Sequence, residues 1–138
     1  MGIDFKPWNE KVMEEFRAND GRVEEFGDAP LVILHTTGAK SGAPRTNPLM
    51  YLPEDDKVVI FASRAGEPKN PDWYYNVKAN PEVTLEFGSG TKPGVATEVT
   101  GAERDRLYAE QARRFPQFAD YERKTTRTIP VVVVTPAG

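Results

Sequence analysis

The sequence has no cysteine, and His35 is the only histidine among its 138 residues. Without cysteine there are no disulfides, no thiolate catalysis and no cysteine-bound iron–sulfur cluster. A single histidine cannot build the multi-histidine sites of zinc or non-haem iron enzymes, so a metal would need carboxylates alone. We therefore expect no metal centre, and we expect His35 to be a buried histidine with a satisfied hydrogen bond.

Long apolar runs are also missing, because no 18 consecutive residues are apolar. Neither a membrane-spanning helix nor a signal peptide is predicted. The formal net charge of −3 gives the molecule no overall attraction for nucleic acid, so any basic site must be local. These features predict a cytoplasmic protein of one domain with a modest core and no nucleic-acid partner.

The N-terminal part carries apolar side chains at helical spacing: Trp8, Val12, Met13 and Phe16. We expect a helix over residues 7–20, within an N-terminal segment 1–26, to pack on a sheet formed by residues 27–138. The alternative is that this helix contacts a membrane surface or a partner protein, although its acidic face disfavours anionic lipid.

Six further segments read as strands because they are short, apolar or alternating, and rich in β-branched residues: 30–36, 47–53, 57–63, 82–87, 95–100 and 128–136. A loose turn is expected over 88–94. A short helix is expected to begin at Asn70 and Pro71 and end before Pro81, and a longer one to span 100–115. Strands joined by hairpins with helices between them predict an antiparallel α+β barrel rather than a βαβ series.

The loop after the first strand reads GAKSGAPR, residues 38–45. It is not a Walker P-loop, because Lys40 does not follow a glycine and Pro44 prevents a helix. We expect a glycine-hinged turn at Ala39 to Gly42 with exposed backbone N–H groups. The side chains of Lys40, Ser41 and Arg45 would converge with them on a phosphate or carboxylate. A solvated hairpin with basic decoration is the alternative.

A second basic loop follows the third strand, and it contributes Arg64, Lys69 and the predicted helix cap Asn70. Two basic loops at neighbouring strand ends in an acidic protein predict a site for a polyanionic ligand. No nucleophile or metal is evident, so an enzyme of this composition would need a cofactor. Aromatic residues could wall a planar ring or pack in the core: Trp73, Tyr74, Tyr75, Phe115, Phe118 and Tyr121.

At these residues the chain resembles the actinobacterial deazaflavin-dependent nitroreductase family, the A-type flavin/deazaflavin oxidoreductases. LHTTGAKSGAPRTNPLMYL, FASRAGEPKNPDWYYNVKANPEV and RTIPVVVV match three ordered segments of that family, over about residues 31–136. The resemblance implies a split β-barrel that binds coenzyme F420, a 5-deazaflavin with a ribityl phosphate and a γ-linked glutamate tail.

The resemblance also implies roles for individual residues. The anions of F420 would be held by the first loop, with Arg64, Lys69 and Asn70 nearby. Trp73 and its helix, with Tyr74, would close over the deazaflavin ring, which would be lined by Asn47, Pro48, Met50, Ala62 and Ser63.

The implied reaction is hydride transfer from the reduced deazaflavin to a small hydrophobic acceptor such as an enone, quinone or nitroaromatic. Ser63 would hydrogen-bond the acceptor oxygen that gains charge. A cofactor carrier without specific turnover and an FMN-binding barrel are the alternatives.

The chain departs from the family's well-known nitroreductase member in its predicted substrate pocket. Phe115 and Phe118 stand where that member has tyrosines, and only Tyr121 keeps a hydroxyl. We therefore expect Tyr121 to be the second catalytic residue. The pattern does not predict activation of bicyclic nitroimidazoles, while reduction of other acceptors stays open.

Overall fold

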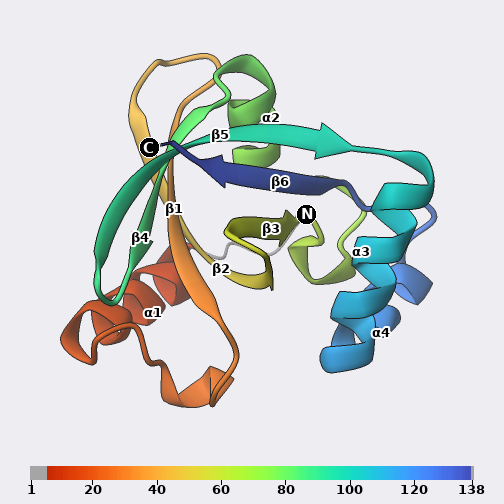
Figure 1. The fold of residues 1–138 in the computed structure, drawn as a ribbon, viewed down its shortest axis with the longest axis horizontal. Helices are drawn as coiled ribbons and strands as arrows, with labels where there is room; N and C mark the ends of the chain where they lie inside the picture. Colours follow the sequence, from red (N-terminus) through yellow and green to blue (C-terminus); the bar gives the residue numbers. More distant parts are fainter. Residues whose placement is uncertain (1–5, 138) are drawn as a thin grey trace.

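The computed structural model describes residues 6–137, which fold as a closed antiparallel barrel of six strands with flanking helices (Figure 1). The strand order is β1-β2-β3-β6-β5-β4. The strands are β1 (Leu31–Thr37), β2 (Pro44–Glu54), β3 (Lys57–Phe61), β4 (Glu82–Phe87), β5 (Gly90–Val99) and β6 (Val131–Pro136). The α+β barrel predicted from the element order is therefore confirmed.

Four α-helices and two 3-10 turns surround the barrel (Figure 1). They are α1 (Lys6–Ala18), η1 (Glu24–Phe26), η2 (Arg64–Gly66), α2 (Asp72–Ala79), α3 (Gly101–Arg114) and α4 (Gln117–Lys124). Helix α2 lies beside the β1–β2 hairpin at one end of the barrel, α1 packs near β2 at the other end, and α3 and α4 lie side by side. None of these helices is long and apolar enough to span a bilayer.

Strand β1 is apolar throughout because both of its faces are covered. Val32 and Leu34 point into the barrel, where they pack with Trp73 of α2. Leu31 and Ile33 point outward into a separate cluster under α1. That cluster also takes up the apolar face of α1, namely Val12, Met13 and Phe16. The described part of α1 thus packs on the sheet as expected, and its buried stripe is not available to a membrane.

Several elements differ from the sequence-based prediction, and three of the differences bear on the site. Strand β2 begins at Pro44 rather than Asn47, because its first residues pair with the end of β1. Strand β5 begins at Gly90, so the predicted loose turn is a tight turn at Gly88 and Ser89, and pairing with β4 overrides the weak strand propensity of residues 90–94. Helix α4 was not anticipated, since Pro116 ends α3 but also starts α4.

Helix α1 is tied to the barrel by a cluster of charges on β4. Arg17 donates to both carboxylate oxygens of Glu86, from Nε at 2.9 Å and from Nη2 at 3.0 Å. His35 Nε2 lies 2.8 Å from the same carboxylate, so the histidine is satisfied as predicted, but it is only half-buried. The hydrogen bonds from Arg17, helped by His35 and opposed by partial burial, lower the pKa of Glu86 to about 2.

This cluster makes stability depend on pH. A carboxylate whose folded pKa is depressed stabilises the fold above its unfolded pKa of about 4.3, and that contribution is lost as the pH falls toward the folded pKa. Glu86→Gln should lower the free energy of unfolding by about 1 kcal/mol at neutral pH, since the pair is partly exposed. Urea titrations between about pH 7 and 2.5 measure this.

The difference between the wild type and Glu86→Gln should shrink steadily below about pH 4. Glu82→Gln, an exposed substitution on the same strand, is the control and should leave the profile unchanged. A difference that stays constant down to about pH 2.5 would rule out the ion pair as its source.

Candidate active site

The barrel has an unpaired strand edge, because β2 has eleven residues and β3 has five. Residues 51–54 of β2 pair with β3, whereas residues 44–50 have β1 as their only paired strand in the described chain. The Tyr51 N–H donates to the carbonyl of Pro30, just before β1 (3.1 Å). Because backbone groups alternate in direction along an antiparallel strand, the N–H and C=O groups of odd-numbered β2 residues point toward β1. The backbone groups of Pro44, Thr46 and Pro48 therefore face the open edge. Both prolines lack an N–H that would need a partner there.

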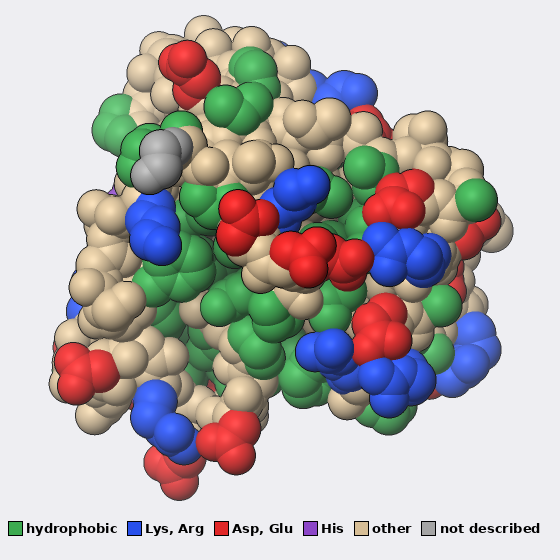
Figure 2. All heavy atoms as spheres, viewed as in Figure 1, with side chains coloured by type: hydrophobic (Ala, Val, Ile, Leu, Met, Phe, Trp, Pro, Cys, Tyr) green, Lys and Arg blue, Asp and Glu red, His purple; other side chains and the backbone are tan. Residues whose placement is uncertain are grey.

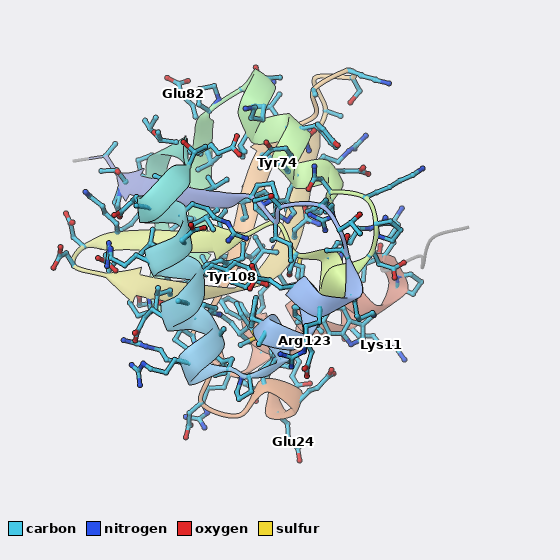
Figure 3. The ribbon with its side chains drawn as sticks, turned by 90° about the vertical axis from the view of Figure 1, so that its right-hand side faces the viewer. Lys11, Glu24, Tyr74, Glu82, Tyr108 and Arg123 are labelled. Atoms are coloured by element: carbon cyan, nitrogen blue, oxygen red, sulfur yellow. The ribbon has the colours of Figure 1, made fainter. Side chains whose placement is uncertain are left out.

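The first basic loop is fixed at the top of this edge by α2. Asn76 is buried on α2, and its Oδ1 accepts a hydrogen bond from Ala39 N–H (2.9 Å). The Asn76 Nδ2 donates to Thr36 Oγ1 (3.2 Å). The β1–β2 hairpin and α2 consequently lie side by side, as both ribbon views show (Figures 1 and 3). Sequence reasoning gave Asn76 no role, although it stands inside the second matched motif.

The loop keeps only part of the free backbone N–H groups expected of it. Ala39 N–H is taken by Asn76, Gly42 N–H donates to Gly38 O, and Ala43 N–H donates to Ser41 Oγ. The N–H groups of Lys40 and Ser41 have no hydrogen-bond partner within the described chain. An anion at this loop would therefore be bound by these two N–H groups together with side chains. The Ser41 hydroxyl keeps its proton to donate, because its oxygen accepts from Ala43 and, at 3.5 Å, from Arg45.

Three cations of the two loops, Lys40, Arg45 and Lys69, differ from the arginines of α3 and α4 in having no carboxylate partner within the described chain. Within the described chain, Lys40, Arg45 and Lys69 form no ion pair, and all three are exposed. In contrast, every arginine of α3 and α4 is paired with an acidic residue: Arg104, Arg106, Arg113, Arg114 and Arg123. Figure 2 shows red and blue side chains mixed on the side where these helices lie. Uncompensated positive charge therefore remains at Lys40, Arg45 and Lys69.

The second basic loop contains an unusual left-handed turn. Three successive residues have positive φ, namely Arg64 (46°), Ala65 (52°) and Gly66 (79°). A non-glycine residue in this region costs about 1–2 kcal/mol, and such strain persists only when surrounding contacts impose it. Gly66 is packed so tightly on α4 that a Cβ would lie 3.0 Å from Tyr121 O. Figure 3 shows η2 against α4, below α2.

Arg127, which was absent from the predicted site, holds this loop. It lies between α4 and β6, and its guanidinium donates to four acceptors: Ala62 O (3.1 Å), Ser63 O (2.8 Å), Glu67 O (3.0 Å) and Asn70 Oδ1 (2.7 Å). Burial lowers the pKa of Arg127 from its usual value, and the positive charge of Arg64 adds to the effect. The arginine opens the third matched motif, RTIPVVVV, which was the one available signal.

Asn70 does not cap α2, contrary to the prediction. The helix begins at Asp72, and Pro71 before it is extended (φ −68°, ψ 153°) without a side-chain cap. The side-chain oxygen Oδ1 of Asn70 accepts from Arg127 instead, and the side-chain nitrogen Nδ2 of Asn70 donates to Tyr75 Oη (3.3 Å). Asn70 therefore joins the second basic loop to α2 rather than presenting the end of a helix to an anion.

The aromatic residues of α2 are divided between the core and the surface. Trp73 is buried among the barrel interior residues, so it closes the end of the barrel. Tyr74 donates to Glu98 Oε1 on β5 (2.9 Å), and burial together with Glu98 raises the pKa of its phenol. Tyr75 is half exposed (51%) and is the α2 aromatic bonded to the second basic loop through Asn70.

The predicted substrate-pocket residues are gathered around α4. The Phe118 ring is buried and packs edge-on against Phe61, Tyr108 and Tyr121, so it supports its neighbours and offers no open surface. Phe115 and Tyr121 are half-buried at the margin of this cluster. Burial raises the pKa of the Tyr121 phenol.

The ring-lining residues expected on β2 and β3 lie on different faces of the sheet. Met50 reaches α4, where Gln117 Nε2 approaches its sulfur at 3.8 Å. Leu49, next to Met50, packs in the barrel interior, so by alternation Asn47 points inward while Pro48 shares the outer face with Met50. Ala62 is fully buried in the barrel core. Ser63 is nearly buried, and its hydroxyl has no hydrogen-bond partner in the described chain.

Residues 8–136 match the model of the family described as F420H2-dependent quinone reductase. The chain belongs to this family. The match confirms the coenzyme F420 and the oxidoreductase class that the sequence motifs implied.

Individual relatives support the assignment. An F420H2-dependent quinone reductase of Mycobacterium tuberculosis, Rv1261c, is 37% identical over 127 residues, which cover 87% of this chain and 84% of the relative. A solved F420H2-dependent reductase, FDR-A, is 44% identical with a TM-score of 0.70, covering 77% of this chain and 94% of the other. A third relative, solved as a domain-swapped dimer, is 38% identical with a TM-score of 0.72. The match covers 96% of this chain and 100% of the other.

More distant solved structures share the fold alone. The haem storage protein HutZ of Vibrio cholerae is 15% identical with a TM-score of 0.60, and covers 94% of this chain and 91% of its own. Similarity of fold therefore does not identify the cofactor, and the identification rests on the family match.

Three features of the site suit F420. The unpaired cations Lys40, Arg45 and Lys69 match a cofactor with a phosphate and several carboxylates. The open edge of β2 offers the backbone carbonyls of Pro44, Thr46 and Pro48 as hydrogen-bond acceptors. The unpartnered Ser63 hydroxyl stands at the end of β3, next to the second basic loop. The residues present therefore fit the cofactor of the family.

The left-handed turn gives a stability prediction with a built-in control. Gly66→Ala should lower the free energy of unfolding by about 1–3 kcal/mol, because its Cβ meets α4 and its φ is positive. Ala65→Gly should raise the free energy of unfolding by up to about 1 kcal/mol, because glycine adopts the positive φ of residue 65 without strain. Denaturant titration of both variants is the measurement. Equal changes of the same sign would refute the described turn.

Proposed function

We propose that this protein transfers a hydride from F420H2 to a small quinone, and that the two basic loops bind the cofactor tail. The observation that carries the proposal is the set of exposed cations without carboxylate partners on two loops joined through α2. Membership of the quinone reductase family supports the acceptor class. Enones and nitroaromatics are further acceptors to test.

Lys40, Ser41 and Arg45 are proposed to hold the anionic tail. Lysine and arginine side chains supply charge-assisted hydrogen bonds, and the Ser41 hydroxyl supplies one more donor. Asn76 would act indirectly, because its two hydrogen bonds fix the loop against α2 before the cofactor arrives. Lys69 and Arg64 would extend the positive charge along the second loop, within the range of Coulomb attraction at physiological salt.

Hydride transfer needs a donor ring and an acceptor ring held face to face. When bound, F420H2 supplies the hydride from its reduced deazaflavin. The protein would contribute position: Pro48 and Met50 on the outer face of β2 and Phe115 beside α4 give apolar walls for the two rings. These walls would also keep water from the reacting atoms.

Negative charge appears on the acceptor oxygen as the hydride arrives. Ser63 is proposed to donate a hydrogen bond to that oxygen, since its hydroxyl has no other partner in the described chain. Tyr121 is proposed as the second donor. A tyrosine phenol is protonated at neutral pH, so it can donate a hydrogen bond, and burial raises the pKa of Tyr121 further.

The first prediction concerns cofactor binding. Lys40→Ala combined with Arg45→Ala should weaken F420 binding by about 2–5 kcal/mol, because each change removes a charge-assisted contact. Fluorescence titration of F420 measures the affinity. A double variant with Lys57→Ala and Lys92→Ala removes the same charge from exposed positions on β3 and β5 and should bind within about threefold of the wild type. Equal losses in both would mean that net charge, not this loop, sets the affinity.

The second prediction separates turnover from binding. Ser63→Ala should lower kcat with menadione by about 10- to 100-fold, because a donor to the developing oxyanion is lost. Its F420 affinity should change little. Ser89→Ala, in the β4–β5 turn, is the control. Loss of F420 binding in Ser63→Ala would give the hydroxyl a cofactor-binding role, and binding without turnover in the wild type would favour a carrier.

A further inference from the structure

The left-handed turn at η2 is bracketed by one guanidinium. Arg127 donates to Ala62 O and Ser63 O before the turn, and to Glu67 O and Asn70 Oδ1 after it. All three guanidinium nitrogens take part. Lysine could not reproduce this set, because an ammonium is a single point on a flexible chain whereas the guanidinium is a rigid planar fork.

The turn would not keep its shape without such contacts. Arg64 and Ala65 both adopt the left-handed region that L-residues disfavour, so a released segment would move toward right-handed or extended backbone. Lys124 helps from the end of α4, since its Nζ donates to Ala65 O (3.2 Å). Ser63 immediately precedes the turn, so any relaxation would redirect its side chain.

The charge of Arg127 is not used in an ion pair. Its four acceptors are neutral carbonyl oxygens, and no carboxylate within the described chain pairs with it. Arg104, by contrast, combines its carbonyl contacts with Asp105 and Glu122. A half-buried cation therefore stands directly behind the Ser63 carbonyl, next to the positive charge of Arg64.

We propose that Arg127 is a positioning residue for the reductase. It holds the left-handed turn in shape, so that the Ser63 hydroxyl faces the acceptor, and through its bond to the Ser63 carbonyl it adds positive charge next to the residue that meets the acceptor oxygen. The catalytic part of this proposal rests on the proposed function, whereas the structural part rests on the contacts of Arg127 alone.

The turn itself is tested in the cofactor-free protein. Amide hydrogen exchange of Gly66 and Glu67, whose N–H groups bond to Ser63 O and Arg64 O, should become at least tenfold faster in Arg127→Lys. Amides of β6 and α3 should exchange at the wild-type rate. Arg123, four residues before Arg127, is paired with Asp120. The control Arg123→Lys should leave all these exchange rates unchanged. Unchanged exchange in Arg127→Lys would overturn the proposal.

The positioning role is tested by turnover with F420H2 and menadione. Arg127→Lys should lower kcat about 10- to 100-fold, as loss of an oriented donor does, while the dissociation constant of F420 changes less than about threefold. A residue that merely stabilises the fold would instead alter the amount of folded enzyme and leave kcat per folded molecule unchanged, which would also overturn the proposal.

A double-mutant cycle links Arg127 to Ser63. Ser63→Ala should lower kcat about 10-fold or more in the wild-type background. In the Arg127→Lys background it should lower kcat less than about twofold, because the hydroxyl is already misplaced there. If the two substitutions lower kcat independently, so that their fold-changes multiply in the double variant, Arg127 does not act through Ser63. If the wild type itself fails to oxidise F420H2, the proposed function falls, and hydrogen exchange still decides whether Arg127 holds the turn.

Discussion

The unequal pairing of β2 is the constraint on which the site depends. A strand of eleven residues lies beside a strand of five, so a closed barrel is formed while one stretch of β2 keeps a free edge. Both basic loops and α2 are arranged around that edge. The open edge is thus a product of strand length and register.

Each basic loop is stabilised by a polar side chain from another part of the chain. Asn76 fixes the first loop from α2, and Arg127 fixes the second loop from the segment before β6. Asn70 joins the second loop to α2 through Tyr75. These bonds order the loops in the absence of an anion, which would reduce the conformational entropy lost in the tail binding proposed above.

Much of this could be read from the sequence, because the signals were local. The six strands, the covered faces of β1 and the basic character of both loops follow from residue pattern. The remaining features depend on contacts between distant segments. Arg127 is 57 residues from the Asn70 side chain it bonds, and the use of Ala39 N–H by Asn76 requires α2 to lie on the hairpin. Asn70 lost its predicted capping role for the same reason: a distant partner competed for its oxygen.

An unpaired strand edge is normally a hazard, because it can recruit the edge of another molecule and start edge-to-edge aggregation. Pro44 and Pro48 counter this hazard, since neither can donate to an incoming strand. The same two residues therefore make this edge a poor template for a second polypeptide.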